Sequence, residues 1–185
     1  MCRVVLLFLR YDASMIFGKI DYLNLLPCHI FLKRYASSTR HHMSVNYKKG
    51  VPSKINDDFL ARRVDVAFIS SIKARRCHNP RLGIIAKGAV NSVFLKPSDT
   101  ELNDSESATS NVLAKTLNLK GEVLIGDKAL RAYLEGLEAI DLAQEWVARY
   151  HKPFVFATLC HHSHHKYIKN LTKTFLKTKY KIPQY

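Results

Sequence analysis

Apolar and polar positions along the chain alternate between two spacings, one typical of strands and one typical of helices. Short, almost wholly apolar runs such as 64–69 and 154–159 are typical of strands buried inside a sheet. Segments with apolar residues at helical spacing, such as 27–36 and 109–117, lie between such runs. This alternation favours an α/β architecture with mainly parallel strand pairing.

The same patterns predict the full order of elements. The expected strands are 16–20, 43–47, 64–69, 82–86, 90–95, 123–125 and 154–159. The expected helices are 27–36, 53–63 with Ser53 as N-cap, 109–117, 141–150 with Asp141 as N-cap, and a basic amphipathic helix after 165. We expect Ile168, Leu171, Phe175 and Leu176 on the apolar face of that last helix. The polar stretch 97–107 is expected to be a loop.

The N-terminus and the cysteines bear on location. Six apolar residues, 4–9, follow Arg3 and are fewer than the ~7–15 of a signal-peptide core, so residues 1–14 are interpreted as an N-terminal extension. A degenerate signal is the alternative. The cysteines (Cys2, Cys28, Cys77 and Cys160) form no CxxC pattern, and we expect free thiols in a reducing cytoplasm.

The net charge of the chain is compatible with several kinds of binding partner. The chain carries 29 basic and 15 acidic residues, a net charge of +14. Such a field attracts nucleic acid, anionic lipid or an acidic small molecule, and it is equally compatible with a solvated basic surface. The chain has no recognised nucleic-acid module and no apolar run near the ~18–20 residues of a membrane helix. We therefore expect neither a nucleic-acid nor a membrane partner.

Polar residues follow two of the expected strands and precede one expected helix, the places where α/β proteins bind ligands. Tyr22 and Asn24 follow the first strand, Ser70 and Ser71 follow the strand 64–69, and the segment 106–111 precedes a helix. Hydroxyl groups and free N–H groups at a helix start can hold a carboxylate or phosphate. Simple helix capping is the alternative at each place.

The histidines of the segment 161–165 form the other cluster that could carry chemistry. A zinc, nickel or copper site, an adventitious metal site and a merely basic surface are all compatible with this composition. The chain has no Walker loop, GxGxxG, HExxH or GxSxG motif, which disfavours nucleotide-dependent and triad-hydrolase functions.

Eight segments, read in order, resemble the chorismate dehydratases of menaquinone biosynthesis by the futalosine route. They span roughly residues 15–160. The segments are 18–27 (GKIDYLNLLP), 51–56 (VPSKIN), 64–71 (VDVAFISS), 88–93 (GAVNSV), 107–110 (SATS), 125–130 (IGDKAL), 141–146 (DLAQEW) and 153–157 (PFVFA).

The resemblance implies a two-lobed fold like the type II periplasmic binding proteins, with a ligand cleft between the lobes and crossing strands near 90–96 and 154–160. Lobe 1 is expected over 15–95 plus 157–185, and lobe 2 over 96–156. Longer members carry further C-terminal helices on the first lobe. We therefore expect uncovered apolar surface on that lobe of this shorter chain.

The resemblance also implies an activity and a set of residues. The reaction is a hydro-lyase reaction that removes water from chorismate to give 3-[(1-carboxyvinyl)oxy]benzoate, with no metal or other cofactor. Asn24 matches the residue implicated in catalysis. The residues expected to bind substrate are Tyr22, Ser70, Ser71, Ser92, Thr109 and Ser110. The alternatives are a non-catalytic binder of a small anion and the sister dihydroxynaphthoate synthase activity; the oligomeric state is left open.

Overall fold

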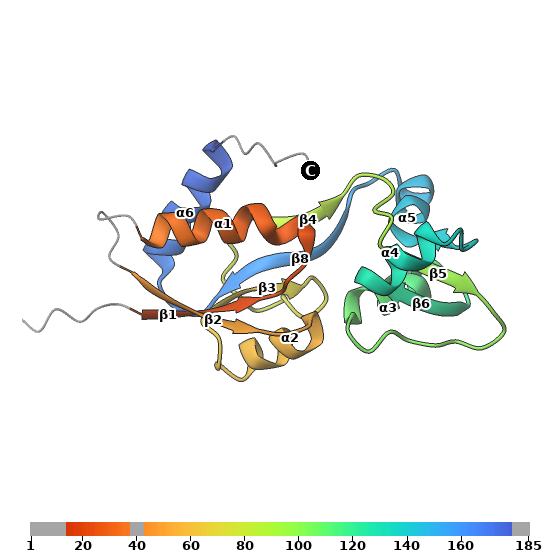
Figure 1. Ribbon diagram of the computed structural model, residues 1–185, viewed down its shortest axis with the longest axis horizontal. Coiled ribbons are helices and arrows are strands. Elements are labelled where there is room, and N and C mark those ends of the chain that lie inside the picture. The colour runs from red at the N-terminus through yellow and green to blue at the C-terminus, as the bar shows by residue number, and fades with distance from the viewer. Residues whose placement is uncertain (1–13, 38–42, 179–185) are drawn as a thin grey trace, which may run out of the picture.

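The computed structural model describes residues 14–37 and 43–178, which form two lobes side by side (Figure 1). The first lobe is built on a five-stranded sheet with the order β2–β1–β3–β8–β4, and the second on a three-stranded sheet with the order β6–β5–β7. Except for Ser14, the expected N-terminal extension lies outside the described residues.

The first lobe takes its sheet from two stretches of chain. Its strands are β1 (Ser14–Lys19), β2 (Ser44–Lys49), β3 (Val66–Ser70), β4 (Gly83–Ala86) and β8 (Phe154–His161). A 3-10 turn, η1 (Leu23–Leu25), leads into α1 (Leu26–Ala36), and the other helices are α2 (Pro52–Leu60) and α6 (His165–Lys177). Helices α1 and α6 cover one face of the sheet, and α2 covers the other (Figure 1).

The second lobe is formed by one continuous stretch of chain. Its strands are β5 (Val93–Pro97), β6 (Gly121–Ile125) and β7 (Ile140–Asp141). Its helices are α3 (Ala108–Thr116), α4 (Gly126–Leu134) and α5 (Leu142–Tyr150). Asp141 caps α5 as predicted, because its carboxylate accepts from the N–H groups of Ala143 and Gln144 at 2.9 and 3.0 Å.

The mixed α/β class is confirmed, but the expectation of mainly parallel sheets is wrong. Strand β1 runs parallel to β2 and β3, whereas β8 runs antiparallel to β3 and β4. Strand β5 is also antiparallel to both of its neighbours. The cause lies in the chain path: the chain leaves the first sheet along β4 and returns from the second lobe along β8 in the opposite direction.

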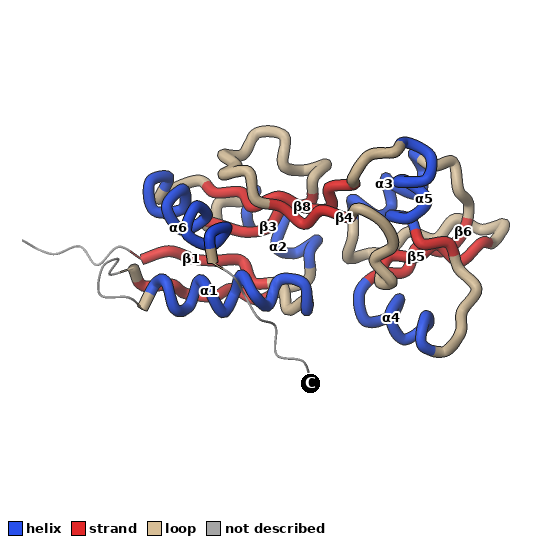
Figure 2. Tube along the Cα trace, turned by 90° about the horizontal axis from the view of Figure 1, so that it is seen from above, coloured by secondary structure: helices blue, strands red, loops and turns tan. Residues whose placement is uncertain are grey.

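The connection between the lobes also differs from expectation. Strand β5 (Val93–Pro97) pairs only with strands of the second sheet. The expectation that 90–96 contains a strand crossing between the lobes is therefore wrong. Strands β4 and β8 lie side by side and reach toward the second lobe (Figure 2). The lobe boundaries at 95–96 and 156–157 stay predictions.

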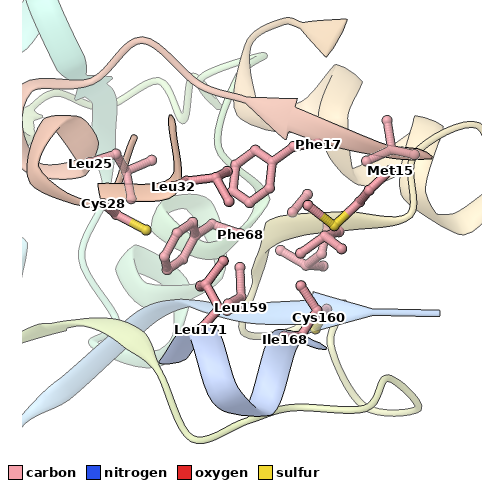
Figure 3. Packing of buried hydrophobic residues seen from close by; sticks show 14 of the residues in the cluster. Met15, Phe17, Leu25, Cys28, Leu32, Phe68, Leu159, Cys160, Ile168 and Leu171 are labelled. Carbon is pink, nitrogen blue, oxygen red and sulfur yellow. The ribbon is translucent and has the colours of Figure 1, made fainter. Parts of the chain in front are cut away.

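Each sheet has its own apolar core. Phe17, Phe68 and Leu159 pack beneath α1 in the first lobe, together with Ile168 and Leu171 of α6 (Figure 3). In the second lobe, a separate cluster forms around Leu95, Leu113, Leu117, Val123 and Leu142. Two cores of this kind account for two lobes.

Two expectations at helix surfaces are wrong. Leu176 is 64% exposed, so the buried face of α6 is narrower than expected. Ser53 does not cap α2, because that helix begins at Pro52 with Val51 in the N-cap position. Proline suits the first helical position, where its fixed φ fits and no N–H is required.

The expectation of free thiols is wrong for two cysteines. Cys77 and Cys160 form a disulfide with their Cα atoms 5.5 Å apart, although 83 residues separate them in the sequence. Cys28 is a free, buried thiol, and Cys2 lies outside the described residues. No helix within 14–37 and 43–178 is both long and apolar enough to span a bilayer.

Candidate functional site

Asn24 lies in η1, just beyond the carboxyl end of β1. Its side chain is exposed and makes no hydrogen bond with any residue that the structure describes. The capping alternative does not hold, since Leu25 is the N-cap residue of α1 and that cap has no side-chain hydrogen bond. The amide of Asn24 is therefore available to a ligand as donor and acceptor.

Tyr22 brings the same segment against the second lobe. A Cβ atom placed on Gly126, the first residue of α4, would lie 3.3 Å from the Tyr22 hydroxyl oxygen. That hydroxyl is buried and has no hydrogen-bond partner among the described residues. Burial, and then the negative charges of Glu106, Asp104 and Asp127, raise the pKa of Tyr22 to about 12, so the phenol stays protonated.

Ser70, at the end of β3, is tied to α2 by a reciprocal pair of hydrogen bonds. The N–H of Ser70 donates to Oδ1 of Asn56 at 3.0 Å, and Nδ2 of Asn56 donates to the Ser70 hydroxyl at 2.8 Å. Both residues are buried. The hypothesis that Ser70 and Ser71 hold an anion at a helix start needs correction, because a turn follows β3 and the Ser71 N–H donates to the carbonyl of Phe156 at 3.0 Å.

The start of α3 contacts β8 at the carbonyl group of Phe156, which also accepts from Ser71. The hydroxyl of Thr109 donates to the carbonyl oxygen of Phe156 at 3.2 Å. Ser107 is the N-cap residue, and its hydroxyl accepts from the N–H of Ser110 at 3.2 Å. The first two N–H groups of the helix, at Ala108 and Thr109, have no acceptor within it and remain as donors.

Ser92 lies next to the start of α4. Its carbonyl oxygen accepts from the N–H of Gly126 at 2.9 Å, and its hydroxyl donates to the carbonyl of Val90 at 3.2 Å. The carboxylate of Asp141 fixes the preceding turn, accepting from the N–H groups of Val90 and Asn91 at 2.9 Å each. This turn therefore positions both Ser92 and the N-terminus of α4.

The structure groups the predicted residues where the two lobes meet. Contacts connect Tyr22 to Ser92 through Gly126, and Ser71 to Thr109 through Phe156. Sequence reasoning missed the roles of Asn56 and Gly126. Gly126 did carry a signal, since a glycine directly after an apolar strand often starts a helix against a ligand or another chain segment.

A pocket of about 280 Å³ lies beside the same end of β1, next to α1. Lys19, Lys33 and Lys49 line it together with the aromatic ring of Tyr47 and the buried side chain of His29. Lys19 and Lys49 also pair with Asp21, and the hydrogen bond from Lys19 is the main cause that lowers the pKa of this carboxyl. The lining is therefore basic with an apolar wall.

The histidine segment behaves differently from a metal centre. Within the described part of the chain, no three histidine, cysteine or acidic residues are placed to hold a metal ion. His162 instead stacks on the ring of Phe59, with centroids 3.9 Å apart, and its Nε2 lies 2.7 Å from the Phe59 carbonyl oxygen.

The sequence of this chain matches a known protein family. Residues 15–122 match the family described as menaquinone biosynthesis. The sequence is 48% identical over 174 residues to a chorismate dehydratase of Campylobacter jejuni, covering 92% of this chain and 78% of that protein.

Solved structures share the fold at low sequence identity. The aliphatic sulphonate binding protein SsuA of Escherichia coli has a TM-score of 0.57 at 9% identity, over 89% of this chain and 72% of SsuA. A putative binding component of an ABC transporter from Wolinella succinogenes, in complex with lysine, has a TM-score of 0.53 at 12% identity, over 89% of each chain. The fold is thus of the two-lobed periplasmic-binding-protein kind.

Proposed function

The chain belongs to the menaquinone biosynthesis family, and from this premise we propose that it is a chorismate dehydratase. The observation that carries the proposal is the 48% identity to the Campylobacter jejuni enzyme over 92% of this chain. The reaction converts chorismate into 3-[(1-carboxyvinyl)oxy]benzoate and water.

In this reaction the main task of the protein is to position the substrate. A ring C–H bond and the C–O bond of the neighbouring hydroxyl break, and the C–H electron pair becomes part of an aromatic ring. Hydroxide leaves with a proton as water. Because aromatisation supplies the driving force, the protein has to hold a dianion, exclude water and assist the leaving hydroxyl.

Asn24 is the proposed catalytic residue. An amide is a poor base, so it acts by donating a hydrogen bond to the leaving hydroxyl or by orienting a substrate carboxylate. Its exposed and unpaired amide supports this role. The enolpyruvyl carboxylate of the substrate itself takes the ring proton and passes it to the leaving hydroxide, so that no protein base is needed.

The substrate carboxylates are proposed to lie between the lobes. The free N–H groups at the start of α3, beside Thr109 and Ser110, supply donors and the positive end of a helix dipole. Tyr22, Ser71 and Ser92 complete the proposed binding set. Ser70 contributes indirectly, because its hydrogen bonds are used to hold Asn56.

The test is turnover of chorismate by the purified protein. We expect product identified by chromatography and mass, and about 100-fold slower turnover in Asn24→Ala, the size of effect seen when one positioned donor is removed. Asn46→Ala is the matched control, since Asn46 is also an exposed asparagine but lies in β2.

The outcome also separates the alternatives. A folded protein that binds chorismate without making product is a binding protein, and this result contradicts the dehydratase. Equal loss of turnover in Asn24→Ala and Asn46→Ala removes the catalytic role from Asn24. We also propose a cytoplasmic location. Free thiols at Cys77 and Cys160 no longer support this location, because these two residues form a disulfide.

A further inference from the structure

A pocket of about 540 Å³ lies in the first lobe, away from the residues proposed to bind chorismate. The loop after β3, strand β8 and helix α6 surround it. Its polar lining consists of His78, Asn79, Arg81, His161, His165 and Lys169. No acidic residue is among the lining residues, and Arg81 and Lys169 make the lining positively charged.

Covalent and hydrogen bonds fix the walls of this pocket. The Cys77–Cys160 disulfide joins the loop to β8, directly beside His78 and His161. The N–H of His161 donates to the carbonyl of His78 at 3.1 Å, extending the same connection. The loop is therefore held against β8 rather than left to move independently.

His161 offers one ring nitrogen to the pocket. The residue is 5% exposed, and its Nδ1 lies 3.1 Å from the carbonyl oxygen of Ser163. Since a carbonyl oxygen only accepts, Nδ1 carries the proton and Nε2 of the neutral ring is an acceptor. No described residue hydrogen-bonds Nε2, although His161 lines the pocket.

The other imidazoles stand close to this ring. The ring centroids of His78 and His165 are 4.4 Å apart, and those of His161 and His165 are 4.9 Å apart. Arg81 and Lys169 add two permanent positive charges to the same lining, which disfavours a metal cation and favours an anion. The carboxylate of Asp65 is 3.4 Å from the Ser163 hydroxyl and is not part of the lining.

We propose that this pocket binds inorganic phosphate, as the hydrogen phosphate ion. Arg81 and Lys169 donate to the phosphate oxygens, and the P–OH group donates to Nε2 of His161. Phosphate fits better than sulfate or a carboxylate, because at neutral pH only the phosphate still carries an O–H for that acceptor.

The charge state of His161 supports the match. Burial is the main cause that lowers its pKa, and the neighbouring His165, His78 and His162 lower it further, against the raising effect of the Ser163 carbonyl. The ring is therefore neutral at neutral pH, which keeps Nε2 an acceptor.

The experiment is a calorimetric titration of the full chain with sodium phosphate at pH 7.5, with ionic strength held constant by sodium chloride. We expect saturable binding, and about tenfold weaker binding in Arg81→Gln and in Lys169→Gln, as for loss of one charge-assisted hydrogen bond. Lys173→Gln is the matched control on α6, since it removes the same charge outside the lining and leaves affinity within about twofold.

A parallel titration with sulfate tests whether the P–OH group of phosphate contributes to binding. We expect sulfate to bind clearly more weakly than phosphate at pH 7.5, because sulfate carries no O–H group for the Nε2 acceptor of His161. Equal affinity for the two anions at pH 7.5, equal weakening by Lys173→Gln, or binding of zinc without binding of phosphate overturns the proposal. Chorismate turnover of Arg81→Gln is expected to be unchanged, so this result is independent of the dehydratase assay.

Discussion

A Cβ atom on Gly126 would lie 3.3 Å from the hydroxyl oxygen of Tyr22, so the glycine leaves room for the phenol of the opposite lobe. Gly126 also has a φ of +59°, which side-chain-bearing residues adopt at a cost of roughly 1 kcal/mol. The contact between the lobes at this point therefore depends on a missing side chain.

Gly126→Ala is expected to lower the free energy of unfolding by about 1–2 kcal/mol and to slow chorismate turnover. The reason is the strained φ together with displacement of Tyr22. Tyr22→Leu in the same background should restore the part of the lost stability that comes from the contact but not the part from φ. A Gly126→Ala protein with unchanged stability and turnover is incompatible with this account.

The Asn56–Ser70 pair predicts a large difference between two truncations. Asn56→Ala leaves the buried N–H of Ser70 without its acceptor and opens a small cavity, at a cost of about 2–4 kcal/mol. Ser70→Ala leaves one N–H of the buried Asn56 amide without its acceptor but keeps the backbone hydrogen bond and removes less volume, and should cost about 1–2 kcal/mol. Urea unfolding measures both, and similar losses for the two variants would contradict the arrangement.

His29 predicts a pH dependence of stability. Burial lowers its pKa to about 4, with repulsion from Lys19 adding to the effect and attraction to Asp21 opposing it. The ordinary pKa of 6.5 applies to the unfolded chain. As the pH falls from 6.5 toward 4, the unfolded chain therefore binds a proton that the folded chain does not, and stability is lost over this window.

The size of this effect is up to about 3 kcal/mol. Urea unfolding of the wild type at pH 7.5 and pH 4.5, with His29→Gln for comparison, measures it. The variant should lose less stability on acidification. An NMR titration midpoint for His29 at its ordinary pKa speaks against the buried, uncharged imidazole.

The disulfide predicts a thiol count. Four cysteines minus the two of the Cys77–Cys160 bridge leave two reactive thiols in the unfolded, unreduced protein, and reduction should raise the count to four. Reduction should also lower the free energy of unfolding by about 2–4 kcal/mol, because the bridge closes a long loop. Four thiols before reduction would show that the pair is a dithiol under the conditions of purification.

Much of the fold followed from local patterns. The apolar runs at 64–69 and 154–159 became β3 and β8 within about two residues, and Asp141 caps α5 as its position suggested. The direction of β8 could not be predicted, since it depends on how the second lobe returns the chain. Helix α4 was missed because Ala129 is its one buried residue, which leaves little apolar periodicity.

The candidate site was predictable only in part. Asn24 and Tyr22 follow a strand, where ligands are expected, and both lie near the meeting of the lobes. The use of the Ser70 and Ser71 N–H groups was not predictable, because their acceptors, Asn56 and Phe156, come from distant segments. The Cys77–Cys160 pair was missed for the same reason.

The position of β8 in the first sheet has a consequence for the order of folding. This strand fills the place between β3 and β4, yet it emerges from the ribosome only after the whole second lobe. The second lobe is continuous in sequence and can close first, whereas β3 waits for a partner about ninety residues later. Until then β3 and β4 have unpaired edges, and the nascent chain is most vulnerable to aggregation during this interval.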